Sequence, residues 1–378
     1  MSSSDNVVRN VPTVLDVMRA IEWMAPPHLA LEGDVNGLLV GNRTNPVHRV
    51  MLALDPYPDA LHQAVKSGAD MLVTHHAILY HPLKRIDTAT ARGKALATAL
   101  SHDLAIYNAH TNLDVAFGGV NDVLASRLGL LDTRILDKTG SDGLRKLVVY
   151  VPPSHHEVVL DAITKAGAGR VGHYSHCTFN TTGTGTFLPE EGTHPYIGTE
   201  GELTRVNEIR VETVVLESLL EAAVQAMLAV HPYEEVAYDI FSLQLEGVPY
   251  GIGRIGDLPE AMPLSNFAET VRDRLGLTHI RFGGAPSTMV RRVAVLGGAG
   301  GKWAKKAKEL GADVLVTSDV DHHTVAEAWH DGLAIVDATH AALERPVLDV
   351  LFKHLSAVFG STLEIVVANV VEDPFTWL

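Results

Sequence analysis

Cysteine is almost absent from this chain: one residue, Cys177, occurs in 378. A single cysteine cannot form an internal disulfide, which is typical of a reducing compartment, so we expect a cytoplasmic protein. No apolar run approaches the ~18 residues of a membrane span. The first residues, MSSSDNVV, lack the basic and apolar segments of a secretory signal. We therefore expect neither a membrane protein nor a secreted one.

Basic residues are also few. Lys and Arg number 30 against 45 Asp and Glu, for a formal net charge of −15. A nucleic-acid surface needs a basic face to displace counterions, so this balance argues against nucleic-acid partners. The apolar share of 46% and charged share of 20% are those of an ordinary globular protein, and the length predicts two or three domains.

Histidine is abundant, and an internal repeat places several histidines at related positions. The chain has 20 histidines, including the pairs His75-His76 and His322-His323. Residues 67–76 (SGADMLVTHH) resemble 310–319 (LGADVLVTSD), with similar blocks before and after them in the same order. Self-similarity of this kind indicates duplicated structural units. We interpret residues 10–130 and 285–378 as two copies of one αβ unit.

Each copy shows apolar, β-branched runs that alternate with amphipathic stretches. The predicted strands are 50–54, 71–74 and 105–108 in the first copy, and 293–296, 314–317 and 334–337 in the second. Strands that alternate with helices predict right-handed crossovers and a mostly parallel sheet. In such sheets, ligands bind beyond the carboxyl ends of the strands. His75, His76, His110 and Asp114 follow these strands in the first copy, as His340 and Glu344 do in the second.

The sequence between the copies has another pattern. Its predicted order is strand 146–152, helix 155–167, strand 173–189, strand 208–218, helix 219–230 and strand 237–243. This succession is ferredoxin-like. We therefore predict an α/β protein: two pseudo-repeated αβ units form one domain (residues 1–130 and 251–378), and residues 131–250 form an inserted ferredoxin-like α+β domain.

A histidine and a carboxylate at equivalent places in both copies predict a metal site. Adjacent histidines on a strand point to opposite faces, so His75 and His76 can share a site only if the backbone turns there or if they hold two neighbouring ions. Imidazole with carboxylate suits Zn, Fe, Mn, Ni or Co. The alternative is a buried polar network without metal.

Four other segments bear on the site or its surroundings. The glycine-rich segment 297–302 (GGAGGK) is either a tight turn beside the crevice or an anion site, and 251–256 (GIGRIG) we expect to be a packing loop rather than a dinucleotide fingerprint. His322 and His323 either line the crevice or begin a helix. Pro346 favours a helix that begins near Arg345, which would leave 340–344 as a loop.

Several longer segments together resemble the GTP cyclohydrolase 1 type 2 homolog family, also called the NIF-three-like family, over nearly the whole chain. The matching segments are VTHHAILYHPLKRI (73–86), NAHTNLDVAFGGVNDVLASRLGL (108–130), HPYEEVAYDI (231–240), GIGRIGDL (251–258), VLVTSDVDHHTVAEA (314–328) and ATHAALERPVLDVL (338–351). One departure is visible: members usually carry Trp-Asp-Asn before a Gly-Leu pair, whereas here Gly33 stands at the Trp and Asp34 remains.

The resemblance implies two divalent metal ions per subunit, held by His75, His76, Asp114, His340 and Glu344, with His110 supporting the ligands. It also implies a PII/CutA-like insert and a toroidal homohexamer with its metal sites on an inner cavity. The family name implies a hydrolase that opens the imidazole ring of GTP and releases formate. Another nucleotide or phosphoester fits the residues equally well, and only Lys84, Arg85 and Arg345 suggest a basic cluster. The alternative is a non-catalytic protein that binds or delivers metal, or a regulatory one.

Overall fold

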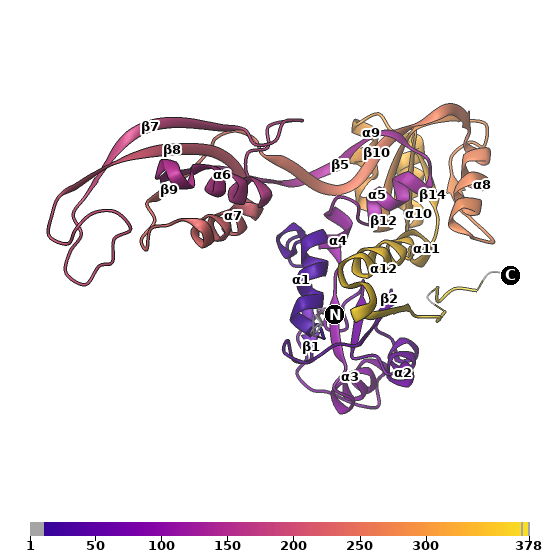
Figure 1. The fold of residues 1–378 in the computed structure, drawn as a ribbon. Helices are drawn as coiled ribbons and strands as arrows, with labels where there is room; N and C mark the ends of the chain where they lie inside the picture. Colours follow the sequence, from indigo (N-terminus) through magenta and orange to yellow (C-terminus); the bar gives the residue numbers. More distant parts are fainter. Residues whose placement is uncertain (1–10, 372, 377–378) are drawn as a thin grey trace, which may run out of the picture. The chain divides into compact units, whose positions relative to one another are not determined.

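The computed structural model describes residues 11–371 and 373–376, and the first eight residues, in which we expected no secretory signal, lie outside them. The chain divides into two compact units, Met1–Thr139 with Tyr250–Leu378, and Gly140–Pro249. Figure 1 shows the elements of each. Along the described part of the chain, no helix has the length and apolarity needed to cross a membrane.

The first unit contains two sheets, one for each sequence repeat. The first sheet has the order β1-β4-β3-β2-β15, and β2, β3 and β4 run parallel, as the repeat predicted. Its strands are β1 (Gly37–Val40), β2 (Arg49–Ala53), β3 (Met71–Thr74), β4 (Ala105–Asn108) and β15 (Glu364–Val367). The crossover helices are α2 (Pro58–Ser67) and α3 (Ala91–Ser101).

The second sheet repeats this plan with β12, β13 and β14 in parallel, in the order β11-β14-β13-β12-β10-β5. Its strands are β5 (Leu131–Asp142), β10 (Val248–Pro263), β11 (Arg281–Gly283), β12 (Met289–Ala299), β13 (Val314–Ser318) and β14 (Ala334–Asp337). Its crossover helices are α9 (Ala304–Glu309), preceded by the short η3 (Gly301–Trp303), and α10 (His322–His330). Antiparallel strands make both sheets mixed: β1 in the first sheet, and β10 and β11 in the second.

The glycine-rich segment 251–256 is not the packing loop that we expected. It lies within β10 and pairs with β12, with Arg254 opposite Val295. A Cβ on Gly251 would lie 2.1 Å from the Asp137 carbonyl oxygen, and one on Gly256 would lie 2.7 Å from the Leu131 carbonyl oxygen. The glycines therefore allow the strands to pack closely. Because glycine lacks the side chains by which a strand is predicted, the sequence did not indicate a strand here.

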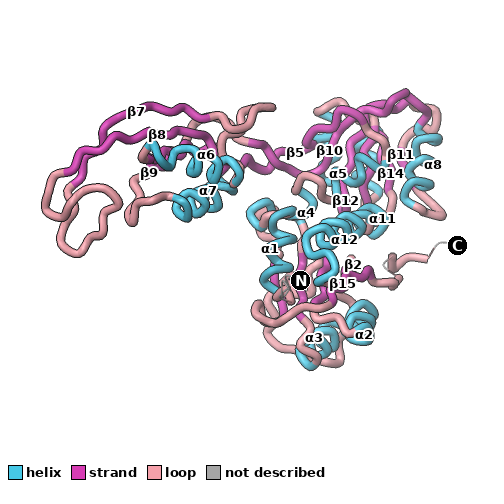
Figure 2. The backbone as a smooth tube through the Cα atoms, viewed as in Figure 1, coloured by secondary structure: helices cyan, strands magenta, loops and turns pink. Residues whose placement is uncertain are grey.

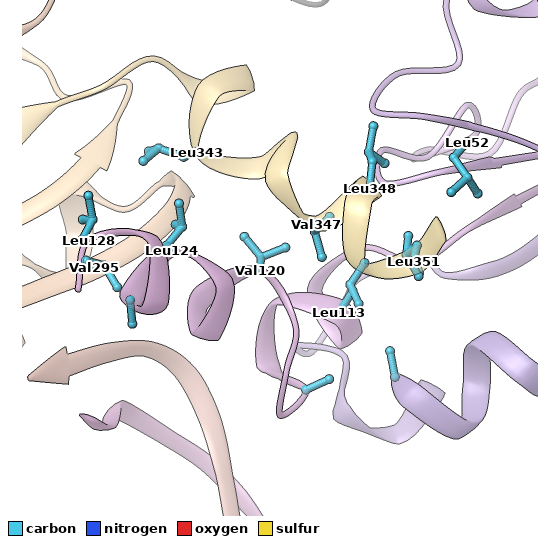
Figure 3. Packing of buried hydrophobic residues seen from close by; sticks show 14 of the residues in the cluster. Leu52, Leu113, Val120, Leu124, Leu128, Val295, Leu343, Val347, Leu348 and Leu351 are labelled. Carbon is cyan, nitrogen blue, oxygen red and sulfur yellow. The ribbon is translucent and has the colours of Figure 1, made fainter. Parts of the chain in front are cut away.

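Helices pack the two sheets against a shared core. They are α1 (Val14–Met24), η1 (Pro27–Leu29), α4 (Thr111–Val115), α5 (Val120–Arg127), α8 (Leu264–Leu275), α11 (His340–Glu344), α12 (Pro346–Phe359) and η4 (Gly360–Thr362). One apolar face of α12 carries Val347, Leu348 and Leu351, and Figure 3 shows these side chains between Leu52 of β2 and Val295 of β12. This core fixes the sheet edges that carry the histidines and carboxylates of the two repeats.

The second unit contains a four-stranded antiparallel sheet in the order β7-β8-β6-β9. Figure 2 labels β7, β8 and β9 of this sheet and the helices α6 and α7. Its elements are β6 (Leu144–Val151), η2 (Pro153–His155), α6 (His156–Lys165), β7 (Thr178–Phe187), β8 (Thr204–Leu216), α7 (Glu217–Val230) and β9 (Tyr238–Ser242). This succession is the predicted β-α-β-β-α-β pattern. Leu147, Val149 and Val151 alternate along β6 and are buried in one cluster with Val159 and Ile163 of α6.

Candidate metal centre

The first repeat contributes two adjacent histidines at the end of β3. The amides of His75 and His76 both donate to the carbonyl oxygen of Leu54, at 3.2 and 3.0 Å, and the Thr74 hydroxyl donates to the carbonyl oxygen of His76 at 2.7 Å. These bonds turn the backbone where the strand ends. The two imidazole rings consequently lie 5.1 Å apart, rather than on opposite faces of the sheet.

The neighbouring strand β4 leads to His110 and Asp114. His110 is the N-cap residue of α4, and Asp114 lies inside that helix with only 5% exposure. The rings of His75 and His110 are 5.2 Å apart, and the Nε2 atom of His75 lies 3.7 Å from Oδ1 of Asp114. Parallel strands therefore bring these four side chains to one edge of the first sheet.

The second repeat contributes His340 and Glu344 from the short helix α11, whereas we expected a loop there. The spacing of four residues places both side chains on one helical face, with His340 Nε2 3.1 Å from Glu344 Oε2. Pro346 begins the next helix, α12, in agreement with its expected place in a first turn. The proline therefore separates two helices instead of excluding the first.

The two repeats meet at Glu344. Its Oε2 lies 3.0 Å from His76 Nε2, and its Oε1 lies 3.7 Å from His75 Nε2. The Nε2 atoms of His76 and His340 are 3.3 Å apart. All six residues singled out in the sequence thus come together, and two overlapping groups, His75/His76/His110 and His76/His340/Glu344, each have ligand atoms within 4.8 Å of one another.

Hydrogen bonds orient the four imidazoles. A carboxylate can only accept, so each Nδ1 that faces one carries the proton and leaves Nε2 as the ligand atom. In each case Nδ1 donates to an oxygen: His76 to Asp55 (2.9 Å), His110 to Asp34 (2.6 Å), His340 to Asp319 (2.6 Å) and His75 to the Ala109 carbonyl oxygen (2.8 Å). Such partners fix the tautomer and ring orientation of metal-binding histidines.

The sequence analysis did not assign a role to these three aspartates, although Asp34 was noted in the family segment. Asp55 follows β2, as His75 and His76 follow β3. Asp319 is the residue that the repeat aligns with His76, so the second copy replaces an imidazole with a carboxylate. That alignment was the available signal for Asp319. Asp34 also accepts from the Thr111 amide at 3.0 Å, which ties the loop before β1 to the start of α4.

The charges of the cluster balance one another. Burial by itself lowers the pKa of His76 and His340, but hydrogen bonds to Asp55, Glu344 and Asp319 outweigh it and raise these pKa values to about 10 and about 9. Burial favours protonation of Glu344 too, yet His75 and the other imidazoles hold its pKa well below the ordinary value. Burial raises the pKa of Asp114 to about 6. Without an ion, the cluster thus favours protonated imidazoles at His76 and His340. Bound cations would supply the positive charge in their place, and these protons would be released.

The donor set fits a divalent cation. Among the described residues, two buried polar atoms of the cluster, His75 Nε2 and Asp114 Oδ1, have no hydrogen-bond partner, and Glu344 Oε2 faces the ring nitrogens of His76 and His340. Such atoms are rare in folded proteins because each one costs free energy unless it is satisfied. They lie among imidazole nitrogens and carboxylate oxygens, the ligands that Zn, Fe, Mn, Ni and Co accept.

The glycine-rich segment 297–302 lies beside this centre, as the turn interpretation expected. Gly298 has a φ of +70°, and a Cβ there would lie 2.6 Å from Glu344 Oε1 and 3.4 Å from His340 Cε1. A left-handed glycine therefore gives the Glu344 carboxylate its room. His322 and His323, by contrast, are exposed and begin α10, where Asp321 accepts from the His323 amide at 2.9 Å.

A cavity of about 1390 Å³ opens onto the centre, with His76, His340 and Asp319 among its lining residues. Of the three basic residues noted in the sequence, Arg85 lines the cavity, whereas Lys84 and Arg345 do not. Two further arginines, which the sequence analysis missed, join the lining: Arg92 and Arg281. The sequence showed no basic cluster apart from Lys84, Arg85 and Arg345, and the arginines of the cavity are a partly different set.

This architecture defines a class: an α/β protein with two repeated units and a buried imidazole and carboxylate cluster where the repeats meet. The model of the family Duf34/NIF3 (NGG1p interacting factor 3) matches residues 12–374, and the chain belongs to this family. The family resemblance seen in the sequence is confirmed.

Relatives match over almost the full length. The chain is 45% identical over 365 residues to the GTP cyclohydrolase 1 type 2 homolog of Halalkalibacterium halodurans, which covers 96% of this chain and 98% of the relative. The protein of the same name from Bacillus subtilis is 41% identical over 367 residues, with 96% and 98% covered. The crystal structure of a Bacillus cereus protein related to NIF3 has a TM-score of 0.89 at 42% identity and covers 98% of this chain and 100% of that one.

Proposed function

We propose that this protein is a metal-dependent hydrolase with two divalent ions per subunit. The observation that carries the proposal is the pair of unpartnered buried atoms, His75 Nε2 and Asp114 Oδ1, which lie with the Glu344 carboxylate beside a large cavity. We assign His75, His76, Asp114, His340 and Glu344 as the ligands and His110 as a supporting residue. Glu344 would offer both of its oxygens as ligand atoms, since Oε1 faces His75 and Oε2 faces His76 and His340.

Divalent ions held there would supply Lewis-acid activation of water for attack on an electrophilic carbon or phosphorus. The protein's own contribution is orientation and exclusion of water. Asp55, Asp34 and Asp319 hold three imidazoles in one tautomer. His75 is fully buried, whereas His76 and His340 are 23% and 36% exposed and line the cavity. A substrate in the cavity would therefore meet the cluster on the side of His76 and His340.

We propose a nucleotide or a related phosphorylated small molecule as substrate. The support is the cavity volume of about 1390 Å³, which exceeds the ~300–1,000 Å³ of common small-molecule pockets, and the arginines in its wall. The names of the relatives make GTP the first molecule to test. Ring opening would release formate, whereas hydrolysis of a phosphoester would release phosphate, so the product identifies the reaction.

The test is a hydrolysis panel. The full-length protein is loaded in turn with Zn, Fe, Mn, Ni or Co, and incubated with GTP, other nucleotides and simple phosphomonoesters, while formate and phosphate are measured. We expect metal-dependent release of one product, and loss of turnover in His75→Ala. His323→Ala is the matched control, since His323 is an exposed histidine outside the cluster. Full metal loading with no turnover on any substrate would refute the hydrolase and leave a protein that binds or delivers metal.

Assembly and location form part of the proposal. We propose a homohexameric ring with its metal sites on an inner cavity, and a PII/CutA-like second unit, supported by the family membership and by the strand order of that unit. Light scattering of the full chain tests the hexamer. The single cysteine, Cys177, is unpaired, which supports a reducing, cytoplasmic location.

A further inference from the structure

Part of the cavity wall is formed by the segment after β3, which contributes arginines and apolar side chains. Residues Leu83, Arg85, Ile86 and Arg92 line the same cavity as His76 and His340. These residues lie between β3 and the first turn of α3, so one crossover of the first repeat supplies His76 and the two arginines. A molecule in this cavity can therefore contact both kinds of group.

Most charged groups of the lining already have partners. Asp55 and Asp319 accept from His76 and His340, Arg281 pairs with Asp337, and Asp87 and Asp373 accept from the amides of Ala89 and Phe375. Arg85 and Arg92 differ, because among the described residues neither has a carboxylate within ion-pair distance. Two permanently charged guanidinium groups in the lining thus have no direct ion-pair partner among the described residues, although aspartates line the same cavity.

Guanidinium groups of this kind suit a phosphate. The planar group donates two parallel hydrogen bonds to phosphate oxygens, and these charge-assisted bonds are about twice as strong as neutral ones. The neighbouring Leu83, Ile86 and Tyr57 give the cavity apolar surface for the rest of a ligand. The lining as a whole therefore suits a molecule with a phosphate at one end and an apolar or planar portion.

We propose that Arg85 and Arg92 bind the phosphate group of the substrate and so determine specificity for phosphorylated molecules. This inference rests on the proposed function, since it assigns the phosphate to the arginines and the reacting atoms to the side of His76 and His340. Both arginines act by direct contact, so each should contribute to binding whether or not the ligand is turned over.

The experiment measures binding, not turnover. Guanosine 5′-monophosphate, guanosine and inorganic phosphate are titrated calorimetrically into the full, metal-loaded protein and into Arg85→Gln, Arg92→Gln and the double variant. Lys94→Gln is the matched control, because Lys94 lies two residues beyond Arg92 on α3 and does not line the cavity. Circular dichroism and metal content of each variant establish that fold and metal centre are intact.

We expect each arginine variant to bind the monophosphate about tenfold or more weakly, the double variant to lose further affinity, and Lys94→Gln to match the unmodified protein. Guanosine should bind with little difference among the variants. The inference is overturned if the monophosphate binds all variants alike, if guanosine binds as tightly as its monophosphate, or if no phosphate compound binds. Absence of metal from the unmodified protein would instead refute the proposed function, so the two failures are distinguishable.

Discussion

Substitution of Gly298 by alanine should weaken metal binding far more than it weakens the fold. The new Cβ would lie 2.6 Å from Glu344 Oε1 and 3.4 Å from His340 Cε1. Contact distances near ~3.5 Å require the carboxylate to move by about 1 Å. Metal and catalytic constellations tolerate displacements of only ~0.5 Å, so the change exceeds what the centre can absorb.

The substitution affects the free energy of folding and the free energy of metal binding by different routes. Alanine at a φ of +70° costs about 1–2 kcal/mol of folding free energy because its Cβ approaches the following carbonyl oxygen. Displacement of Glu344 acts on the metal instead, and disturbance of this kind typically costs about 10–100-fold in affinity. The atom that must move is the far end of a side chain, so we expect little additional loss of stability.

Gly276→Ala is the matched control. Gly276 ends α8 at a φ of +71°, and nothing lies within 4 Å of the position of its Cβ. Urea unfolding of the metal-free proteins should show similar losses for both variants, whereas competition with a chromophoric chelator should show weakened metal binding only for Gly298→Ala. Unchanged metal affinity in Gly298→Ala, or an equal loss in Gly276→Ala, would refute the reasoning.

Three further predictions concern other residues of the first unit. Asp319→Asn should lower metal affinity about 10–100-fold with an unchanged circular dichroism spectrum, since His340 loses a charged acceptor at 2.6 Å, and unaltered affinity in a chelator titration would contradict this. Arg254→Met should destabilise the protein by about 3 kcal/mol in urea unfolding, because it removes a buried guanidinium that pairs with the partly buried Asp122 and donates to the carbonyl oxygens of residues 251 and 253; a loss under 1 kcal/mol would show that the pair contributes little. His323→Ala should leave metal content unchanged and stability within about 0.5 kcal/mol, and any loss of metal would place this exposed histidine in the centre.

The repeat made much of this fold predictable. Three similar blocks in the same order predicted β2, β3 and β4 and their counterparts β12, β13 and β14, because buried parallel strands carry continuous apolar runs. It did not predict that β15, from the end of the second repeat, joins the first sheet beside β2. Such pairing depends on long-range packing by α12, which leaves no local pattern in the sequence.

The sequence also predicted the clustered histidines better than the aspartates that accept hydrogen bonds from them. His75, His76 and His110 follow strands whose carboxyl ends must meet, so their proximity follows from topology. Asp55 and Asp34 come from segments that approach only in the folded chain, and a lone aspartate after a strand is common. The helix at 340–344 was missed because a one-turn helix has too few residues to show periodicity, and Pro346 favours a boundary without excluding a preceding turn.

The most direct test of the metal centre is an anomalous difference map from a crystal of the full protein, recorded above the absorption edge of the metal found by X-ray fluorescence. The account predicts two peaks about 3.5–4 Å apart, one among His75, His110 and Asp114 and the other between His76 and His340, with Glu344 between them. Peaks outside these residues, or none in protein that was saturated with metal, would contradict it.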